Sequence, residues 1–138
     1  MSSVWRGLIP FLSAAVVFAF GTTSDLEHAK FFALGGIYED GRMSEGERAL
    51  RTLLRSSDAS ARLHTLVSHA SPAGRLYALL GLRLRDRSAY TRALQTLRGD
   101  NVKVDTMRGC IIGSESFHAL VSEIEHGRYD SFLSRPAW

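Results

Sequence analysis

Cysteine, proline and lysine are scarce in this chain of 138 residues, and each scarcity excludes something. The single cysteine, Cys110, excludes an intrachain disulfide framework and any zinc site built from several cysteines. Three prolines, with 45% hydrophobic and 22% charged residues, exclude a disordered or fibrous chain. The length and composition predict one globular domain.

Lysine is almost entirely replaced by arginine, since Lys30 and Lys103 are the only lysines among 17 basic residues. An arginine excess of this kind is typical of GC-rich coding. The net charge is only +3, and the basic residues do not form the dense stripe that nucleic-acid-binding surfaces show. We therefore expect no nucleic-acid partner.

Residues 1–21 have the pattern of a signal peptide: Arg6 precedes an apolar run over residues 7–20, and small residues follow it. We predict cleavage between Gly21 and Thr22 and a periplasmic or secreted mature chain. As a helix the run would span only about 21 Å, short of the ~30 Å hydrocarbon core. Two alternatives stay open: this segment anchors the chain to a membrane, or it forms a core helix of a cytoplasmic protein.

Beyond this segment, apolar periodicity and capping residues predict a succession of short helices. A first helix is expected over residues 25–34, ended by Gly35 and Gly36. Ser44 begins a capping box, in which the side chain of Glu47 should accept a hydrogen bond from the backbone N–H of Ser44. The later helices are expected to start at Asp58 or Ser60, to cover residues 72–84, and to run from Asp86 to Gly99 and from Ser114 to Gly127.

The helix expected over residues 72–84 is apolar on almost every side, which predicts that it is central and buried. Gly74, Ala78 and Gly81 share one side of it, and small residues let a neighbouring backbone approach closely. A packing reason is expected because each glycine costs a helix about 1 kcal/mol relative to alanine.

The sequence thus predicts an all-α fold for residues 22–138, a compact bundle of five to six short helices with antiparallel neighbours. One segment departs from the helical period. Residues 102–112 contain Gly109 and are expected to form a short β-hairpin or an irregular stretch. The apolar residues of the tail should dock on the core; these are Tyr129, Phe132, Leu133 and Trp138.

Residues 71–104 carry a set of positions shared by certain helical hairpins: Pro72, Arg75, Ala78, Leu80, Gly81, Asp86, Leu94, Leu97, Asp100 and Val102. With these positions the stretch resembles the HEAT-repeat family. The resemblance implies paired helices, a scaffold role in binding other proteins, and a further repeat opening after Asp100. Gly109 and Gly113 fall where that repeat should lie, so we expect HEAT-like packing within a compact bundle.

Candidate catalytic and metal-binding residues are few. Two pairs, Glu115 with His118 and Glu123 with His126, have the Glu-x-x-His spacing of di-iron bundles, but on one helix they cannot converge on one ion. The apolar neighbours of Cys110 predict a buried, inert thiol. We expect no metal, no cofactor and no catalysis; the alternative is a small enzyme that uses Cys110 or a His/Glu pair.

Candidate partner-binding residues lie in two places. The densest basic spot is a predicted corner between two helices, formed by Arg83, Arg85, Arg87 and Arg92. Tyr38 lies in the loop before Ser44, and loops carry binding functions more often than cores do.

The function predicted is that of a non-catalytic exported protein that binds another protein, in a partner-sequestering or scaffold role. Immunity proteins against secreted effectors are similar in size and location, which is an analogy and no motif match. A membrane contact is expected only through residues 1–21, if they are not cleaved. A further alternative is an adaptor that meets an anionic surface through Arg83, Arg85 and Arg87.

Overall fold

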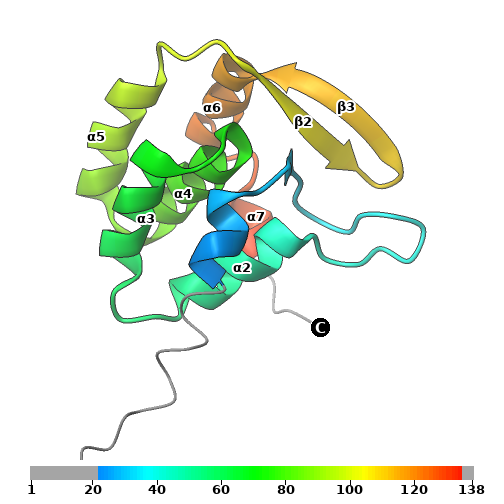
Figure 1. Cartoon of the computed structure of the whole chain (residues 1–138), viewed down its shortest axis with the longest axis horizontal. Coiled ribbons are helices and arrows are strands. Elements are labelled where there is room, and N and C mark those ends of the chain that lie inside the picture. The colour runs from blue at the N-terminus through cyan, green and yellow to red at the C-terminus, as the bar shows by residue number, and fades with distance from the viewer. Residues whose placement is uncertain (1–21, 135–138) are drawn as a thin grey trace, which may run out of the picture.

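Residues 22–134 are described by the computed structural model, and they form a mixed α/β fold (Figure 1). This part of the chain has seven helices, with 58% of it helical, and a three-stranded mixed sheet that accounts for 15%. The first helix covers residues 22–27. The other elements, in chain order, are β1 (Phe31–Phe32), α2 (Glu45–Leu54), α3 (Ala59–His69), α4 (Pro72–Arg85), α5 (Arg87–Leu97), β2 (Lys103–Arg108), β3 (Ile111–Ser116), α6 (Phe117–Glu125) and α7 (Asp130–Ser134).

The all-α prediction is wrong first at β1, which lies where a helix over residues 25–34 was expected. Phe31 and Phe32 pair in parallel with β2. The ring of Phe32 is buried, with its centroid 4.9 Å from that of Tyr77 and 5.2 Å from that of Tyr129. Contacts with rings far along the chain therefore favour the extended backbone over the local helical pattern.

The expected hairpin near 102–112 is present, but it is longer than expected and takes in the residues thought to begin the last helix. β2 and β3 pair antiparallel, from Lys103 opposite Ser116 to Arg108 opposite Ile111. Gly109 has a φ of +59°, and it is the first residue of the two-residue turn. Glycine at this position is the signature of a type II′ turn, whose twist matches that of the paired strands.

The HEAT-like packing does not continue beyond one helical hairpin. α4 and α5 follow each other closely, as the resemblance implies, but the chain enters the sheet at Lys103, where the HEAT pattern would continue with a second helix pair. Ser116, and not Ser114, therefore caps the last long helix, and its side chain accepts the N–H of Ala119. The expected compact bundle of helices is therefore replaced by helices packed on a small sheet.

α4 is central and buried, as predicted: from Ala73 to Leu82 every residue except Arg75 is buried. It contacts α2, α3, α5, α6 and two strands. Its glycines do allow close approach. A Cβ at Gly74 would lie 2.1 Å from the carbonyl oxygen of Leu26, in the helix over residues 22–27.

Two predicted helix starts are confirmed by their caps. The Ser44 hydroxyl accepts the N–H of Glu47, and Asp86 accepts the N–H of Ala89. Asp86 also accepts a hydrogen bond from the Ser60 hydroxyl at 2.6 Å. These hydrogen bonds, that from Ser60 above all, hold the pKa of Asp86 below its ordinary value.

The tail docks on the core through Tyr129, which is buried, and through Phe132, which lies against Gly35. The predicted signal peptide, its cleavage point after Gly21, and Trp138 lie outside the described residues. Between residues 22 and 134, no helix has both the length and the apolar character that crossing a bilayer requires.

Candidate functional site

The arginines of the predicted corner differ in exposure, although Arg83 and Arg87 both lie over the ring of Tyr90. Arg83 turns toward α7, where its Nε lies 3.0 Å from Asp130, and its side chain is only 14% exposed. The hydrogen bond to Asp130 raises the pKa of Arg83. Arg85, Arg87 and Arg92 are exposed, and Arg92 donates to the Ser88 hydroxyl.

The Glu/His pairs of the sequence analysis do not converge. His118 and His126 are exposed and lie near backbone carbonyls, while the two glutamates take part in ion pairs with arginines. Across residues 22–134, nowhere do three His, Cys, Asp or Glu side chains gather in a way that could hold a metal ion.

Cys110 corrects another prediction: its thiol is exposed and not buried. The type II′ turn places this residue at the end of the hairpin, away from the core. Its apolar neighbours, which suggested burial, are themselves the most exposed large hydrophobic side chains of the described chain: Ile111 is 75% exposed and Ile112 66%.

The loop before α2 and the turn of the β2–β3 hairpin lie side by side. The N–H of Tyr38 donates to the carbonyl of Gly109 at 3.0 Å, and Ile37 bridges to the same glycine. This places the loop before α2 beside the turn of the hairpin, and both project from the helical body in Figure 1. Tyr38, Cys110, Ile111 and Ile112 together form what we call the tip surface.

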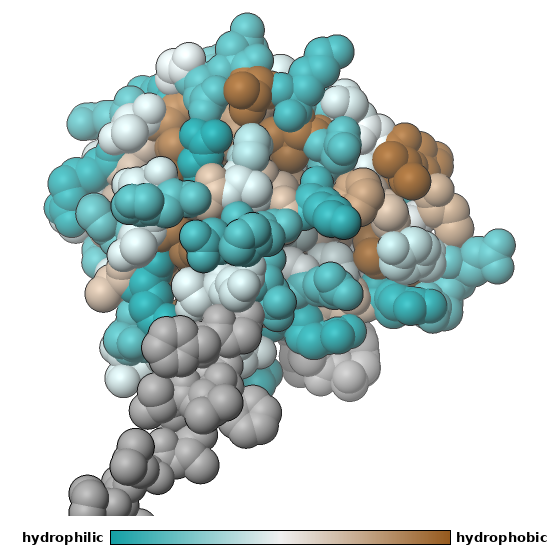
Figure 2. All heavy atoms as spheres, viewed as in Figure 1, coloured by the Kyte–Doolittle hydropathy of each residue, from teal (hydrophilic) through white to brown (hydrophobic). Residues whose placement is uncertain are grey.

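The tip surface is apolar on both faces of the hairpin. Side chains alternate along a strand, so Ile111 and Ile112 point to opposite faces. Ile111 lies opposite Arg108, and Ile112 lies opposite the buried Met107. In Figure 2, hydrophobic atoms stand exposed over the end of the hairpin.

Tyr38 is held in an unusual backbone conformation. Its φ of +59° makes it the only non-glycine residue with a positive φ among those that the structure describes. The guanidinium of Arg42 lies 5.1 Å from the centre of its ring, and Asp40 pairs with Arg42 at 3.0 Å. The ring is nevertheless 49% exposed, and strained residues of this kind cluster at binding and catalytic sites.

β3 forms an edge of the sheet, because the strand order is β1-β2-β3 and no strand in the described range covers its outer side. The residues that flank a two-residue turn form the first hydrogen-bonded pair of a hairpin. The backbone groups of Ile112 and Ser114 therefore point to the outer edge. Such an edge can accept a further strand from another polypeptide.

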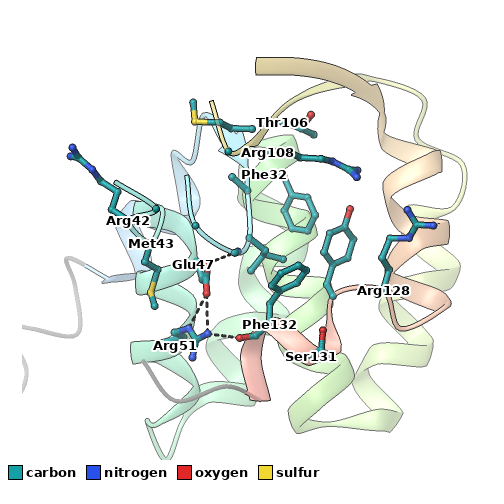
Figure 3. A pocket seen from close by; sticks show the side chains of 18 residues that line it. Phe32, Arg42, Met43, Glu47, Arg51, Thr106, Arg108, Arg128, Ser131 and Phe132 are labelled. Carbon is teal, nitrogen blue, oxygen red and sulfur yellow. Dashed lines mark hydrogen bonds and ion pairs between the residues drawn. The ribbon is translucent and has the colours of Figure 1, made fainter. Parts of the chain in front are cut away.

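A cleft of about 840 Å³ opens beside the tip surface, between the loop before α2, β2 and the tail. Its floor is aromatic: the Tyr129 ring lies 5.2 Å from Phe32 and 6.5 Å from Phe132, measured between centroids. Figure 3 shows the rings of Phe32 and Phe132 in the middle of the view, with Arg42, Arg51, Arg108 and Arg128 placed around them. We call this the arginine cleft, after Arg42, Arg51, Arg108 and Arg128.

Glu47 is the only acidic residue among those that line the cleft, and it is 3% exposed. The predicted capping box is half formed, because this side chain does not return to Ser44. Instead its Oε2 accepts the N–H of Gly35 at 2.9 Å, and its Oε1 pairs with Arg51 at 2.9 Å. Arg51 also donates to the carbonyl of Phe132. These contacts join α2, the loop and the tail (Figure 3).

A second carboxylate, Glu123, gathers three donors at the edge of the cleft. Arg128 Nη1 lies 3.3 Å from one oxygen, Arg108 Nη2 lies 3.4 Å from the other, and the Tyr129 hydroxyl donates to that second oxygen. Burial, and then the hydrogen bond to Glu123, raise the pKa of Tyr129 above its ordinary value. This hydroxyl therefore stays protonated and remains a donor at neutral pH.

Of the residues predicted from sequence, the tip surface includes Tyr38 and Cys110, which were singled out for different reasons. The arginines of the cleft were missed because they lie in four separate segments. In sequence, Gly109 and Cys110 stand between two apolar stretches, and a glycine in the first position of a two-residue turn is a known signal for a hairpin. No protein-family model matches the chain, and comparison with curated proteins finds no match.

Proposed function

We propose that this protein acts by binding another polypeptide through the tip surface, without catalysing a reaction. The observation that carries the proposal is the exposure of Ile111 and Ile112 on opposite faces of the hairpin end. Burying an isoleucine gains about 1.5–3 kcal/mol, so a partner that encloses both side chains gains substantial binding energy.

The surroundings of the two isoleucines support the same function. The outer edge of β3 offers backbone hydrogen-bonding groups next to them, and strand addition combines such groups with pockets for alternate side chains. Tyr38 extends the surface with an aromatic ring, a residue type enriched at the centres of interfaces. Its contact with Gly109 makes the loop and the hairpin one continuous surface.

The single cysteine allows a direct test, because a thiol-reactive photo-cross-linker can be attached at Cys110. In extract of the native host, we expect a discrete cross-linked product that is lost in the Ile111→Ser/Ile112→Ser double variant. The free energy of unfolding of this variant should stay within about 0.5 kcal/mol of the wild-type value, since both side chains are exposed.

The matched control moves the cross-linker to the exposed helix α5, as Cys110→Ser with Gln95→Cys. This label should not give the product. The same products from both labels, or an unchanged product in the isoleucine variant, would show that the tip surface does not bind the partner.

We also propose that binding takes place in the periplasm or outside the cell, on the pattern of residues 1–21. The intact mass of the protein recovered from compartments of its host checks this. A chain that begins at Thr22 in an exported fraction is the expected result. A full-length chain in the cytosol would contradict it.

A further inference from the structure

We propose that the arginine cleft binds an acidic segment of the partner in which a bulky apolar side chain is flanked by carboxylates. This inference rests on the proposed binding function and names the chemistry of the bound segment. The cleft adjoins the tip surface, because its lining includes Arg42, which lies over the Tyr38 ring, and Gly109, which precedes Cys110 in the turn. A polypeptide seated on the tip surface can therefore continue into it.

The floor of the cleft suits a bulky apolar group. Phe32, Tyr129 and Phe132 form a run of rings, with aliphatic and thioether side chains such as Leu34 and Met107 at its borders. The volume of about 840 Å³ is that of a pocket which holds a sizeable ligand. Phe132 and Leu34 are only partly buried, so a phenylalanine or leucine side chain can lie against them and be removed from water.

The rim of the cleft suits carboxylates. The side chains of Arg42, Arg108 and Arg128 are 61%, 55% and 62% exposed. Each already has an acidic neighbour: Asp40 for Arg42, Glu115 and Glu123 for Arg108, and Glu123 for Arg128. Exposed ion pairs of this kind contribute little, so an entering carboxylate can join or replace them.

Glu123 shows that the rim can bind a carboxylate. Two guanidinium groups and the hydroxyl of Tyr129 converge on its two oxygens from different segments of the chain. The contacts to Glu123 use one nitrogen of Arg108 and one of Arg128, whereas a guanidinium has three nitrogens and five N–H donors. Arg108 uses the same Nη2 for Glu115, so its other two nitrogens and those of Arg128 can bind an entering carboxylate without breaking the contacts with Glu123.

Blocked tripeptides test the proposal without knowledge of the partner. The probe is glutamate–phenylalanine–aspartate, and the controls are its uncharged glutamine–phenylalanine–asparagine analogue and glutamate–serine–aspartate. We expect the probe to bind the full-length protein about tenfold more tightly than either control, a difference of about 1.4 kcal/mol. In NMR titrations the shifts should fall on the glycine amides that line the cleft, those of Gly35, Gly36, Gly41 and Gly109.

Two further measurements test whether the arginines of the rim bind the probe. The Arg108→Gln/Arg128→Gln variant should lose most of the binding, whereas Arg85→Gln/Arg92→Gln, which removes two exposed arginines outside the cleft, should keep it. The affinity of the wild type should also fall as salt is raised. Equal binding of the uncharged analogue, shifts outside the cleft, or no shift at the highest probe concentration would overturn the proposal.

The failure of this inference can be told apart from the failure of the proposed function. If the tripeptides do not bind but the isoleucine variant still loses its cross-linked product, the tip surface binds a partner and the cleft does not take an acidic segment. If the tripeptides bind in the cleft but the Cys110 label captures nothing specific, the cleft is a binding site and the tip surface is not.

Discussion

Replacing Gly74 with alanine is expected to destabilise the protein by about 1–3 kcal/mol, the range for forcing an extra methyl group into a packed core. In an exposed helix the same change would stabilise by about 1 kcal/mol, so the expected sign is reversed. The reason is the carbonyl oxygen of Leu26, which lies 2.1 Å from where the new Cβ would stand. Backbone cannot rotate away as a flexible side chain can.

Urea unfolding measures this effect as a fall in the transition midpoint with an unchanged slope. Gly99→Ala is the matched control, because nothing lies within 4 Å of its added Cβ, and it should stay within about 0.5 kcal/mol of the wild type. A Gly74→Ala variant as stable as the wild type would mean that residues 22–27 do not pack against α4.

Glu47→Ala should destabilise the protein by about 3 kcal/mol or more, because removing one partner of a buried ion pair leaves the other charge poorly compensated. Arg51, whose side chain is 13% exposed, would lose its carboxylate, and the Gly35 N–H would lose its acceptor. The loss should also loosen the tail, since Arg51 is held at the Phe132 carbonyl by the same contacts.

Thermal or urea unfolding gives the size of the loss. Glu45→Ala removes an exposed acid from the same first turn and should cost no more than about 1 kcal/mol, the usual effect of a charge on a helix end. If the two variants were equally stable, Glu47 would be an ordinary capping residue and the connection between α2 and the tail would carry no energy.

Much of the helical part could be predicted from sequence because its signals are local. Ser44, Ser71 and Asp86 cap helices where the sequence places them, and the apolar residues of α4 indicate its burial. A helix satisfies its backbone within a few residues, so a short window contains most of the information.

The sheet could not be predicted in the same way, since its first strand depends on residues far along the chain. β1 is only two residues long and exists through its pairing with β2 and the packing of Phe32 on Tyr77 and Tyr129. Cys110 was misjudged for a related reason: apolar neighbours indicate burial in a helix, but at a hairpin end they are the exposed residues themselves.

The candidate site was accessible to sequence reasoning only in part. Tyr38 could be proposed because it lies in a loop, but its hydrogen bond with Gly109 joins residues that no short window contains. The arginine cleft is assembled from four segments, and in sequence each of its arginines looks like an ordinary solvated residue.

The parallel pairing of Phe31 with Asp105 has a consequence for the order of folding. All of α2, α3, α4 and α5 lies between these two residues, so closing that long loop early is entropically unfavourable. We therefore expect the helices to bring the two chain segments together before β1 pairs with β2, and the contact between Tyr38 and Gly109 to form with that pairing. Joining Tyr38 to the hairpin therefore depends on this long-range pairing, whereas the hairpin itself is local.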